Sequence, residues 1–103
     1  MGIFDFLRGG GIDKGIEEYR ATDRALLLDV RSAQEYSEGH IPGSVNLPLQ
    51  NIGSIKTERD TPIFVYCLSG GRSQQAVSAL KQMGYTNVKN IGGISSYRGK
   101  VEY

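Results

Sequence analysis

The sequence predicts a small α/β domain built on a parallel sheet with helices on both faces. Two observations favour this fold class. Short apolar runs of strand length, at 25–30 and 63–66, alternate with helical patterns such as the one from Ser73 onward, and strands that alternate with helices form parallel sheets. The chain of 103 residues is also long enough for one core and too short for a second.

We expect an N-terminal segment, 1–11, followed by one domain that covers 12–103. Met1–Arg8 is amphipathic, but Asp5 interrupts its apolar run and Gly9–Gly11 follow it. This start is too short to span a bilayer and lacks the regions of a signal peptide. We therefore predict a terminal segment that docks on the domain or frays, a cytoplasmic location, and no stable membrane association.

The first half of the domain predicts helix, strand and helix in turn. Apolar residues at positions 12, 16 and 19 have the spacing of an amphipathic helix over 12–19, with Asp13 as its N-cap. The apolar run 25–30 is too short for a helix, so we interpret it as a buried parallel strand. Ser32 then caps a short helix over 33–38.

Polar side chains follow the first strand. Asp29 and Arg31 stand at its end, where α/β sheets present their functional loops. We expect them to support these loops through an ion pair or hydrogen bonds, with Glu35 as a candidate third member. Direct substrate contact by Arg31 is the alternative. His40 lies in a tight turn rich in glycine, for which a structural role is favoured over pairing with a cysteine.

The remaining elements follow from apolar spacing and turn residues. A brief strand is expected at 44–47, and a helix at 49–55 with Pro48 in its first turn. The helix from Ser73 buries a stripe that ends before Gly84, a good C′ residue. A last strand follows at 86–91, and then come a Gly92-Gly93 turn and one helical turn over 94–97.

The stretch 61–79 carries the chemistry. The only cysteine, Cys67, stands between a buried strand and a helix, where free N–H groups and the helix dipole favour an anion. We therefore expect a populated thiolate. The residues expected to surround its reacting sulfur are Leu68, Ser69, Gly70, Gly71, Arg72 and Ser73. Ser73 either caps the helix, which is favoured, or donates to the sulfur, and Arg72 either contacts substrate or braces the loop.

The composition excludes several classes of function. Lys and Arg number 12 against 11 Asp and Glu, for a net charge of +1, so no basic face is available for a nucleic acid. One cysteine allows no internal disulfide and no resolving thiol. Cys67 and His40 are the only soft metal ligands and no spaced cluster surrounds them, so we expect no metal and no cofactor.

Four residues separate Cys67 from Arg72. The longer C-x5-R loop is the form seen in cysteine-dependent phosphatases, and it makes a bowl wide enough for phosphate. A loop shorter by one residue suits a single extra sulfur on Cys67, which is a persulfide stabilised by backbone N–H groups. A phosphatase or arsenate reductase of the related type is the less favoured alternative, also because Tyr66 stands where those enzymes usually carry histidine.

Over 12–97 the chain resembles the single-domain rhodanese-type sulfurtransferases of bacteria. Four segments in this order carry the resemblance: Leu28–Arg31, Glu35–Pro48, Cys67–Ser73 and Gly92–Ile94. Two positions depart from the family pattern. Tyr97 stands where the family often has tryptophan, as a packing substitute, and Leu68 stands where a basic residue often follows the cysteine, which leaves the donor open.

The resemblance implies a ping-pong sulfurtransferase. The Cys67 thiolate would take sulfane sulfur from a small anionic donor such as thiosulfate, or from a persulfide, and pass it to a thiol or to cyanide. The alternative is a sulfur carrier or interaction module that exchanges persulfide sulfur with protein partners and turns over small molecules slowly.

Overall fold

The computed structural model describes residues 11–103. Of the predicted N-terminal segment it therefore includes only Gly11, which belongs to the first helix. Four strands form a parallel sheet in the order β2-β1-β3-β4. Their bounds are Leu26–Asp29 for β1, Val45–Asn46 for β2, Ile63–Cys67 for β3 and Val88–Gly93 for β4.

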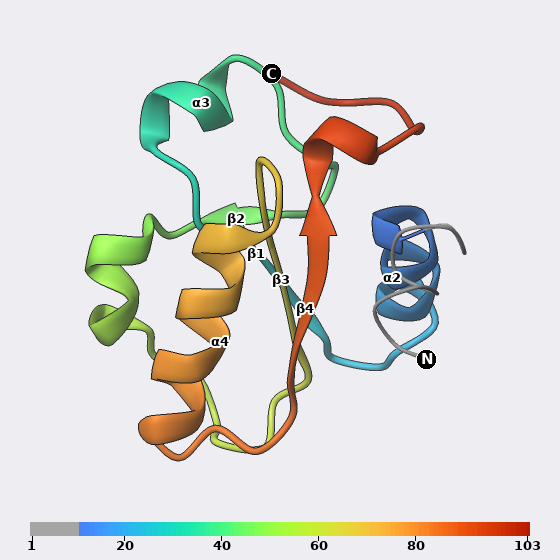
Figure 1. Cartoon of the computed structure of the whole chain (residues 1–103). Helices are drawn as coiled ribbons and strands as arrows, with labels where there is room; N and C mark the ends of the chain where they lie inside the picture. The colour runs from blue at the N-terminus through green and yellow to red at the C-terminus, as the bar shows by residue number, and fades with distance from the viewer. Residues whose placement is uncertain (1–10) are drawn as a thin grey trace.

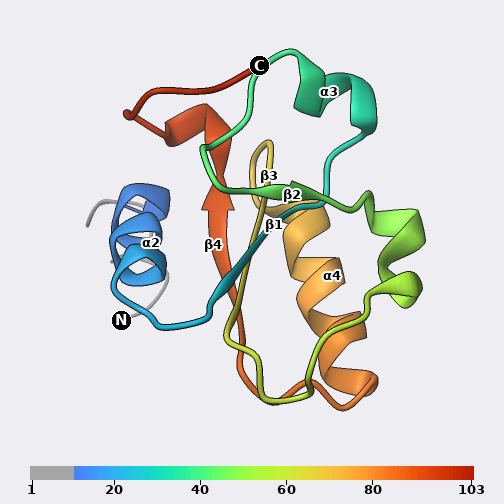
Figure 2. The same ribbon diagram turned by 180° about the vertical axis from the view of Figure 1, so that it is seen from behind.

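Helices cover both faces of this sheet. The α-helices are α2 (Gly11–Arg20), α3 (Ala33–Ser37) and α4 (Gly71–Gln82), and two 3₁₀ helices are η1 (Leu49–Ser54) and η2 (Ile94–Ser96). Figure 1 and the reverse view in Figure 2 place α4 and η1 on one side of the sheet and α2 on the other. The predicted α/β class, with a parallel sheet between two helical layers, is confirmed.

The side chains of β3 point alternately into two apolar clusters. Ile63, Val65 and Cys67 belong to the cluster under α4, while Phe64 and Tyr66 belong to the cluster under α2. Side chains alternate between the two faces of a strand, and both faces are covered here, so the run is apolar without interruption. The same alternation directs Cys67 toward the α4 side of the sheet.

Helix α2 packs closely on β4. A Cβ added at Gly15 would lie 2.5 Å from the Ile91 side chain, so glycine is required for this approach. The prediction of Asp13 as N-cap is wrong, because the helix begins at Gly11. The Asp13 carboxylate instead accepts a hydrogen bond from the Arg98 N–H at 3.0 Å, which holds the C-terminal segment against α2.

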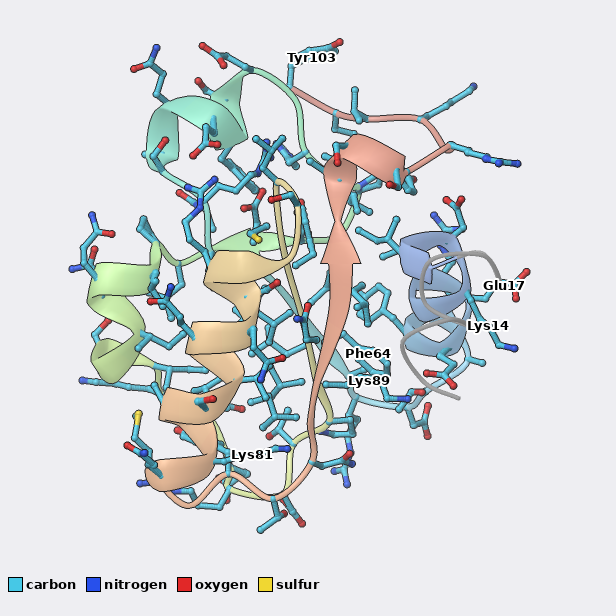
Figure 3. All side chains as sticks on the ribbon, in the orientation of Figure 1. Lys14, Glu17, Phe64, Lys81, Lys89 and Tyr103 are labelled. Atoms are coloured by element: carbon cyan, nitrogen blue, oxygen red, sulfur yellow. The ribbon has the colours of Figure 1, made fainter. Side chains whose placement is uncertain are left out.

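Lys89 of β4 forms a further contact with α2, at the surface. Its ammonium donates to the Glu18 carboxylate at 2.6 Å and lies 6.0 Å from the centre of the Phe64 ring. Figure 3 shows Phe64 and Lys89 together between β4 and α2. Both groups of this ion pair are about half exposed, so its contribution to stability is small.

The predicted start of α3 is confirmed, whereas the predicted helix after Pro48 differs in type and in both ends. Ser32 caps α3 in a full capping box with Glu35, as its sequence spacing predicts. The helix expected at 49–55 is the 3₁₀ helix η1, which ends at Ser54, and Pro48 precedes it as N-cap instead of lying in its first turn.

Two boundaries near the glycines differ from the prediction. Helix α4 begins at Gly71, two residues before Ser73. Gly92 and Gly93 do not form a turn: they are the last residues of β4, because β4 continues its pairing with β3 through them. Within residues 11–103, no helix is both long and apolar enough to cross a membrane.

Candidate active site

Cys67 is the last residue of β3 and is only 1% exposed. Its Sγ accepts a hydrogen bond from the Gly70 N–H at 3.0 Å and lies 3.4 Å from the Ser73 Oγ. The loop turns back on the sulfur because Gly70, the N-cap of α4, has a φ of 109°, a conformation that side chains with a Cβ disfavour. The sulfur thus faces the first turn of α4.

Two opposing effects set the pKa of Cys67. Burial alone would raise this pKa, but hydrogen bonds from the Ser73 hydroxyl and from the N–H groups of Ser73, Gly70 and Ser69 outweigh it, and the net pKa is lowered. Hydrogen bonds to the charged form of an acid favour that form. The hydrogen bonds of the loop therefore favour the anionic form of this sulfur.

A lowered pKa gives a measurable pH dependence. The thiolate of Cys67 should form with a midpoint below the ordinary thiol value of 9.0, and it should be lost as the pH falls through that midpoint. Because the chain has one cysteine, its far-ultraviolet thiolate absorbance, measured against Cys67→Ser as the tyrosine background, reports this group alone. A midpoint at or above 9.0 would contradict the prediction.

Ser73 and Asn90 form a polar contact that the sequence did not reveal. The Ser73 Oγ donates to the Asn90 Oδ1 at 2.7 Å, and the same Oδ1 accepts from the Gly92 N–H at 2.9 Å. The Asn90 amide nitrogen donates to the Gly70 carbonyl at 3.2 Å, which fixes its orientation. Since a hydroxyl proton can rotate, Ser73 can donate to Asn90 or to an ionised Cys67.

This contact also decides the role of Ser73. The sequence favours capping by Ser73, but this prediction is wrong: Gly70 is the N-cap, and Ser73 is buried in the first turn of α4, beside the sulfur. The alternation of 86–91 predicts a strand through Asn90, but it gives no sign of the contact with Ser73, which lies 17 positions away in the chain.

The end of β4 packs against the backbone of the loop at Leu68 and Ser69. A Cβ added at Gly93 would lie 2.2 Å from the Leu68 carbonyl oxygen and 2.5 Å from the Ser69 Cα. Both are backbone atoms, so a larger residue at Gly93 would displace the loop. The Ser95 N–H also donates to the Leu68 carbonyl at 3.1 Å. The Gly92-Gly93 pair at the end of β4 thus packs directly against the backbone of the loop.

Arg72 braces the loop against α3. Its Nη1 and Nη2 donate to Glu35 Oε1 at 2.8 Å and Oε2 at 3.0 Å. The hydrogen bond from Arg72 is the main reason that the pKa of Glu35 falls to about 2. Glu35 is therefore ionised throughout the physiological pH range, and it joins Arg72 instead of completing the Asp29–Arg31 pair.

Asp29 and Arg31 form a second, buried ion pair. The Arg31 Nη2 donates to the Asp29 Oδ2 at 2.7 Å, and the Arg31 N–H donates to Oδ1 at 2.9 Å. The Arg31 Nη2 also donates to the Gly39 carbonyl at 2.8 Å, and the Asn46 side chain donates to the carbonyls of both residues. This network joins the end of β1 to the 39–43 turn, as a supporting role for the pair requires.

The 39–43 turn has its own anchor in Tyr66, which is fully buried. The Tyr66 hydroxyl accepts from the Ile41 N–H at 3.0 Å and lies 3.0 Å from the Ser44 Oγ, and burial raises the pKa of Tyr66. A tyrosine within a buried strand needs a partner for its hydroxyl, so the sequence held a signal for this contact.

The contacts of His40 are with Tyr36 and with the C-terminal segment. Its Nδ1 lies 2.9 Å from the Tyr36 carbonyl, and its ring stacks on the Tyr36 ring with 3.6 Å between centroids. Its backbone pairs with Glu102 near the C-terminus. These contacts agree with the structural role expected for His40.

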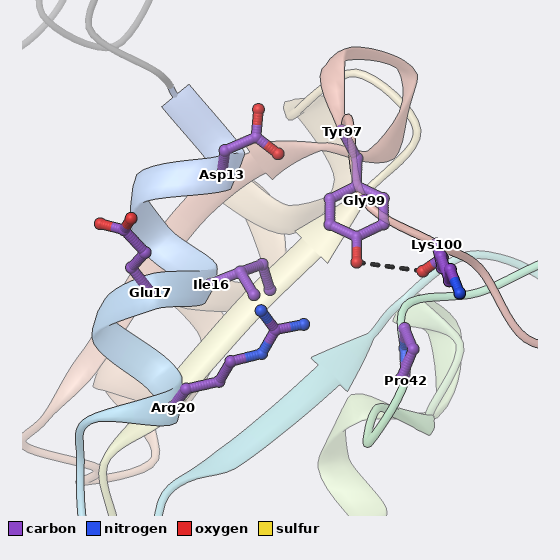
Figure 4. Close-up of a pocket in the computed structure, with 8 residues that line it drawn as sticks. All are labelled: Asp13, Ile16, Glu17, Arg20, Pro42, Tyr97, Gly99 and Lys100. Atoms are coloured by element: carbon purple, nitrogen blue, oxygen red, sulfur yellow. Dashed lines mark hydrogen bonds between the residues drawn. The ribbon is translucent and has the colours of Figure 1, made fainter.

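A separate hollow lies between α2 and the C-terminal segment, and Figure 4 shows it. Asp13, Arg20, Pro42 and Lys100 are among its lining residues, and the Tyr97 hydroxyl donates to the Lys100 carbonyl at 3.0 Å beside it. Tyr97 also packs on the apolar cluster under α2, in agreement with its predicted packing role. None of the loop residues 67–73 lines this hollow.

Comparison with known proteins places this chain in a family. A family model described as a rhodanese-like domain matches residues 13–100. Thiosulfate sulfurtransferase PspE of Escherichia coli is 37% identical over 71 residues, which are 65% of this chain and 68% of PspE. The putative sulfur carrier protein YrkF of Bacillus subtilis is 37% identical over 85 residues, and this chain spans 46% of its length.

A solved structure is also similar to this chain. The structure described as rhodanese with anions from E. coli aligns with a TM-score of 0.69 and 30% identity, and the alignment covers 76% of this chain and 96% of that one. The predicted resemblance is thereby confirmed, and relatives named for sulfur transfer support sulfurtransferase activity in general. The chain belongs to the rhodanese-like domain family.

Proposed function

We propose that the protein is a sulfurtransferase that carries sulfur as a persulfide on Cys67. One observation carries the proposal: the Cys67 Sγ lies within 3.0 Å of the Gly70 N–H and 3.4 Å of the Ser73 Oγ, and its pKa is lowered. A buried thiolate with fixed donors around it is an activated nucleophile that needs no separate base. Residues 68–73 form the proposed binding loop for the transferred sulfur.

The proposed cycle has two displacements that balance without an added oxidant. The Cys67 thiolate attacks the outer sulfur of a donor such as thiosulfate, the donor S–S bond breaks, and sulfite leaves with the bonding pair. An acceptor such as cyanide or a thiolate then attacks the outer sulfur of the Cys67 persulfide. The thiolate of Cys67 is released, and thiocyanate or a new persulfide is formed.

A sulfur carrier that serves protein partners is the second candidate. Leu68, the residue after Cys67, is 45% exposed, so the loop presents to solvent an apolar side chain that contact with another protein would cover. The relative YrkF, named as a putative sulfur carrier, supports the same alternative. The chemistry on Cys67 is identical in both, and only the partner differs.

The mass of the intact chain tests the proposal. Incubation with a sulfane sulfur donor should add one sulfur atom, about 32 Da, and dithiothreitol should remove it. Sulfite, which contains no sulfane sulfur, is the control. It should not produce a dithiothreitol-reversible mass gain of one sulfur atom. Failure of the wild-type protein to gain the sulfur from thiosulfate, a small persulfide and a persulfidated protein would refute the function.

A further inference from the structure

The charges around the candidate site are already paired within the protein. Arg72, in the first turn of α4, makes two hydrogen bonds to Glu35 of α3. Both side chains are partly exposed, at 36% and 28%, so this pair lies at the surface, where a substrate can approach it. The pKa of Glu35, near 2 because of Arg72, keeps its negative charge in place at neutral pH.

A second pair accounts for the other arginine of the predicted site. Arg31 makes hydrogen bonds with its side-chain Nε and Nη2 to the Asp29 carboxylate, and both residues are buried. The two arginines and their two carboxylates therefore sum to zero charge. Within this part of the structure, neither arginine offers an uncompensated positive charge to an incoming anion.

This neutrality distinguishes between classes of sulfur donor. Thiosulfate carries two negative charges at neutral pH and must approach a thiolate, so it needs an unpaired cation to offset repulsion. A persulfide on a carbon chain carries at most one negative charge on its sulfur, so its repulsion by a thiolate is smaller than that of thiosulfate. The site therefore fits the second class better.

We propose that Glu35 is a specificity-determining residue that selects carbon-bound persulfides over thiosulfate by neutralising Arg72. This inference rests on the proposed sulfur transfer by Cys67. In the favoured step, the Cys67 thiolate attacks the outer sulfur of R–S–SH. The S–S bond of the donor breaks, R–S⁻ leaves with the bonding pair, and the proton remains on the transferred sulfur. The sulfane sulfur moves between two thiols, so there is no net oxidation.

Rates of sulfur loading in four proteins test this role: wild type, Glu35→Gln, Arg72→Gln and the double variant. The second-order rate of mass gain is measured with thiosulfate, with 2-hydroxyethyl persulfide, and with a persulfidated cysteine peptide that represents a protein donor. Glutamine at position 35 can still accept from the Ser32 N–H, as Glu35 does at 2.9 Å, so the cap of α3 is retained.

Glu35→Gln is expected to raise the thiosulfate rate relative to the persulfide rate by about tenfold, since it frees one positive charge near a dianion. The gain should disappear in the double variant, because it depends on the Arg72 charge. An unchanged ratio in Glu35→Gln, or a gain that survives in the double variant, would overturn the inference.

A salt titration of the wild-type protein tests the same idea without any variant. Repulsion between thiosulfate and a site without spare positive charge is screened by salt, so the thiosulfate rate should rise with ionic strength. A rate that falls with salt would reveal an attractive cationic site and would overturn the inference. If none of the three donors loads sulfur on any of the four proteins, the proposed function itself fails, which is a distinct result.

Discussion

Replacement of Cys67 by serine is expected to abolish sulfur transfer and the reversible gain of one sulfur. The serine hydroxyl is not ionised at neutral pH and forms no persulfide, so turnover should fall by about four orders of magnitude or more. Cys67 is the only cysteine in the chain, so no second thiol can take over. Intact-mass measurement after donor treatment, together with steady-state rates, checks this result.

The serine variant is a well-matched control because it retains a polar atom at the end of β3. The Gly70 N–H, now 3.0 Å from sulfur, keeps an acceptor, and the alternation that directs position 67 toward α4 is unaffected. A thermal melt close to that of the wild type is expected to accompany the loss of activity. Reversible sulfur uptake by the serine variant would disprove the persulfide at Cys67.

Among the substitutions proposed for this protein, replacement of Asp29 by alanine is expected to lower the free energy of unfolding most. Asp29 is fully buried and Arg31 is 5% exposed, so the change leaves a buried guanidinium without its counter-charge. Breaking a buried pair in this way costs about 3–5 kcal/mol, a large part of the roughly 5–15 kcal/mol that stabilises a typical domain. Urea unfolding of both proteins measures the difference in the free energy of unfolding.

Asp23→Ala is the matched control for this change. It removes the same carboxylate from an exposed position, where a substitution is expected to change stability by no more than about 0.5 kcal/mol. Asp29→Asn removes only the charge and should also be strongly destabilising. If Asp29→Ala unfolds at the same urea concentration as Asp23→Ala, the buried pair is not what joins β1 to the 39–43 turn.

Local patterns in the sequence were sufficient for most of the fold. The apolar run 63–66 is uninterrupted because both faces of β3 are covered, and the stripe Ala76, Val77 and Leu80 is buried on α4 as its spacing predicts. The capping box at Ser32 depends on residues three positions apart, and so it too could be found in the sequence. Local signals failed at the ends of helices, at Asp13 and Pro48, and at Gly92-Gly93, which continues β4 instead of forming a turn.

The position of Cys67 was determined in the same local way, by the end of a buried strand and the start of a helix. Its surroundings were decided by tertiary structure. The Arg72–Glu35 pair joins residues 37 positions apart, and the Ser73–Asn90 hydrogen bond joins residues 17 apart. Periodicity and spacing report only neighbours along the chain, whereas these partners meet because the first turn of α4 contacts both α3 and β4. The sequence by itself thus determined the fold class and the reacting sulfur, and the tertiary structure decided which charges and donors surround that sulfur.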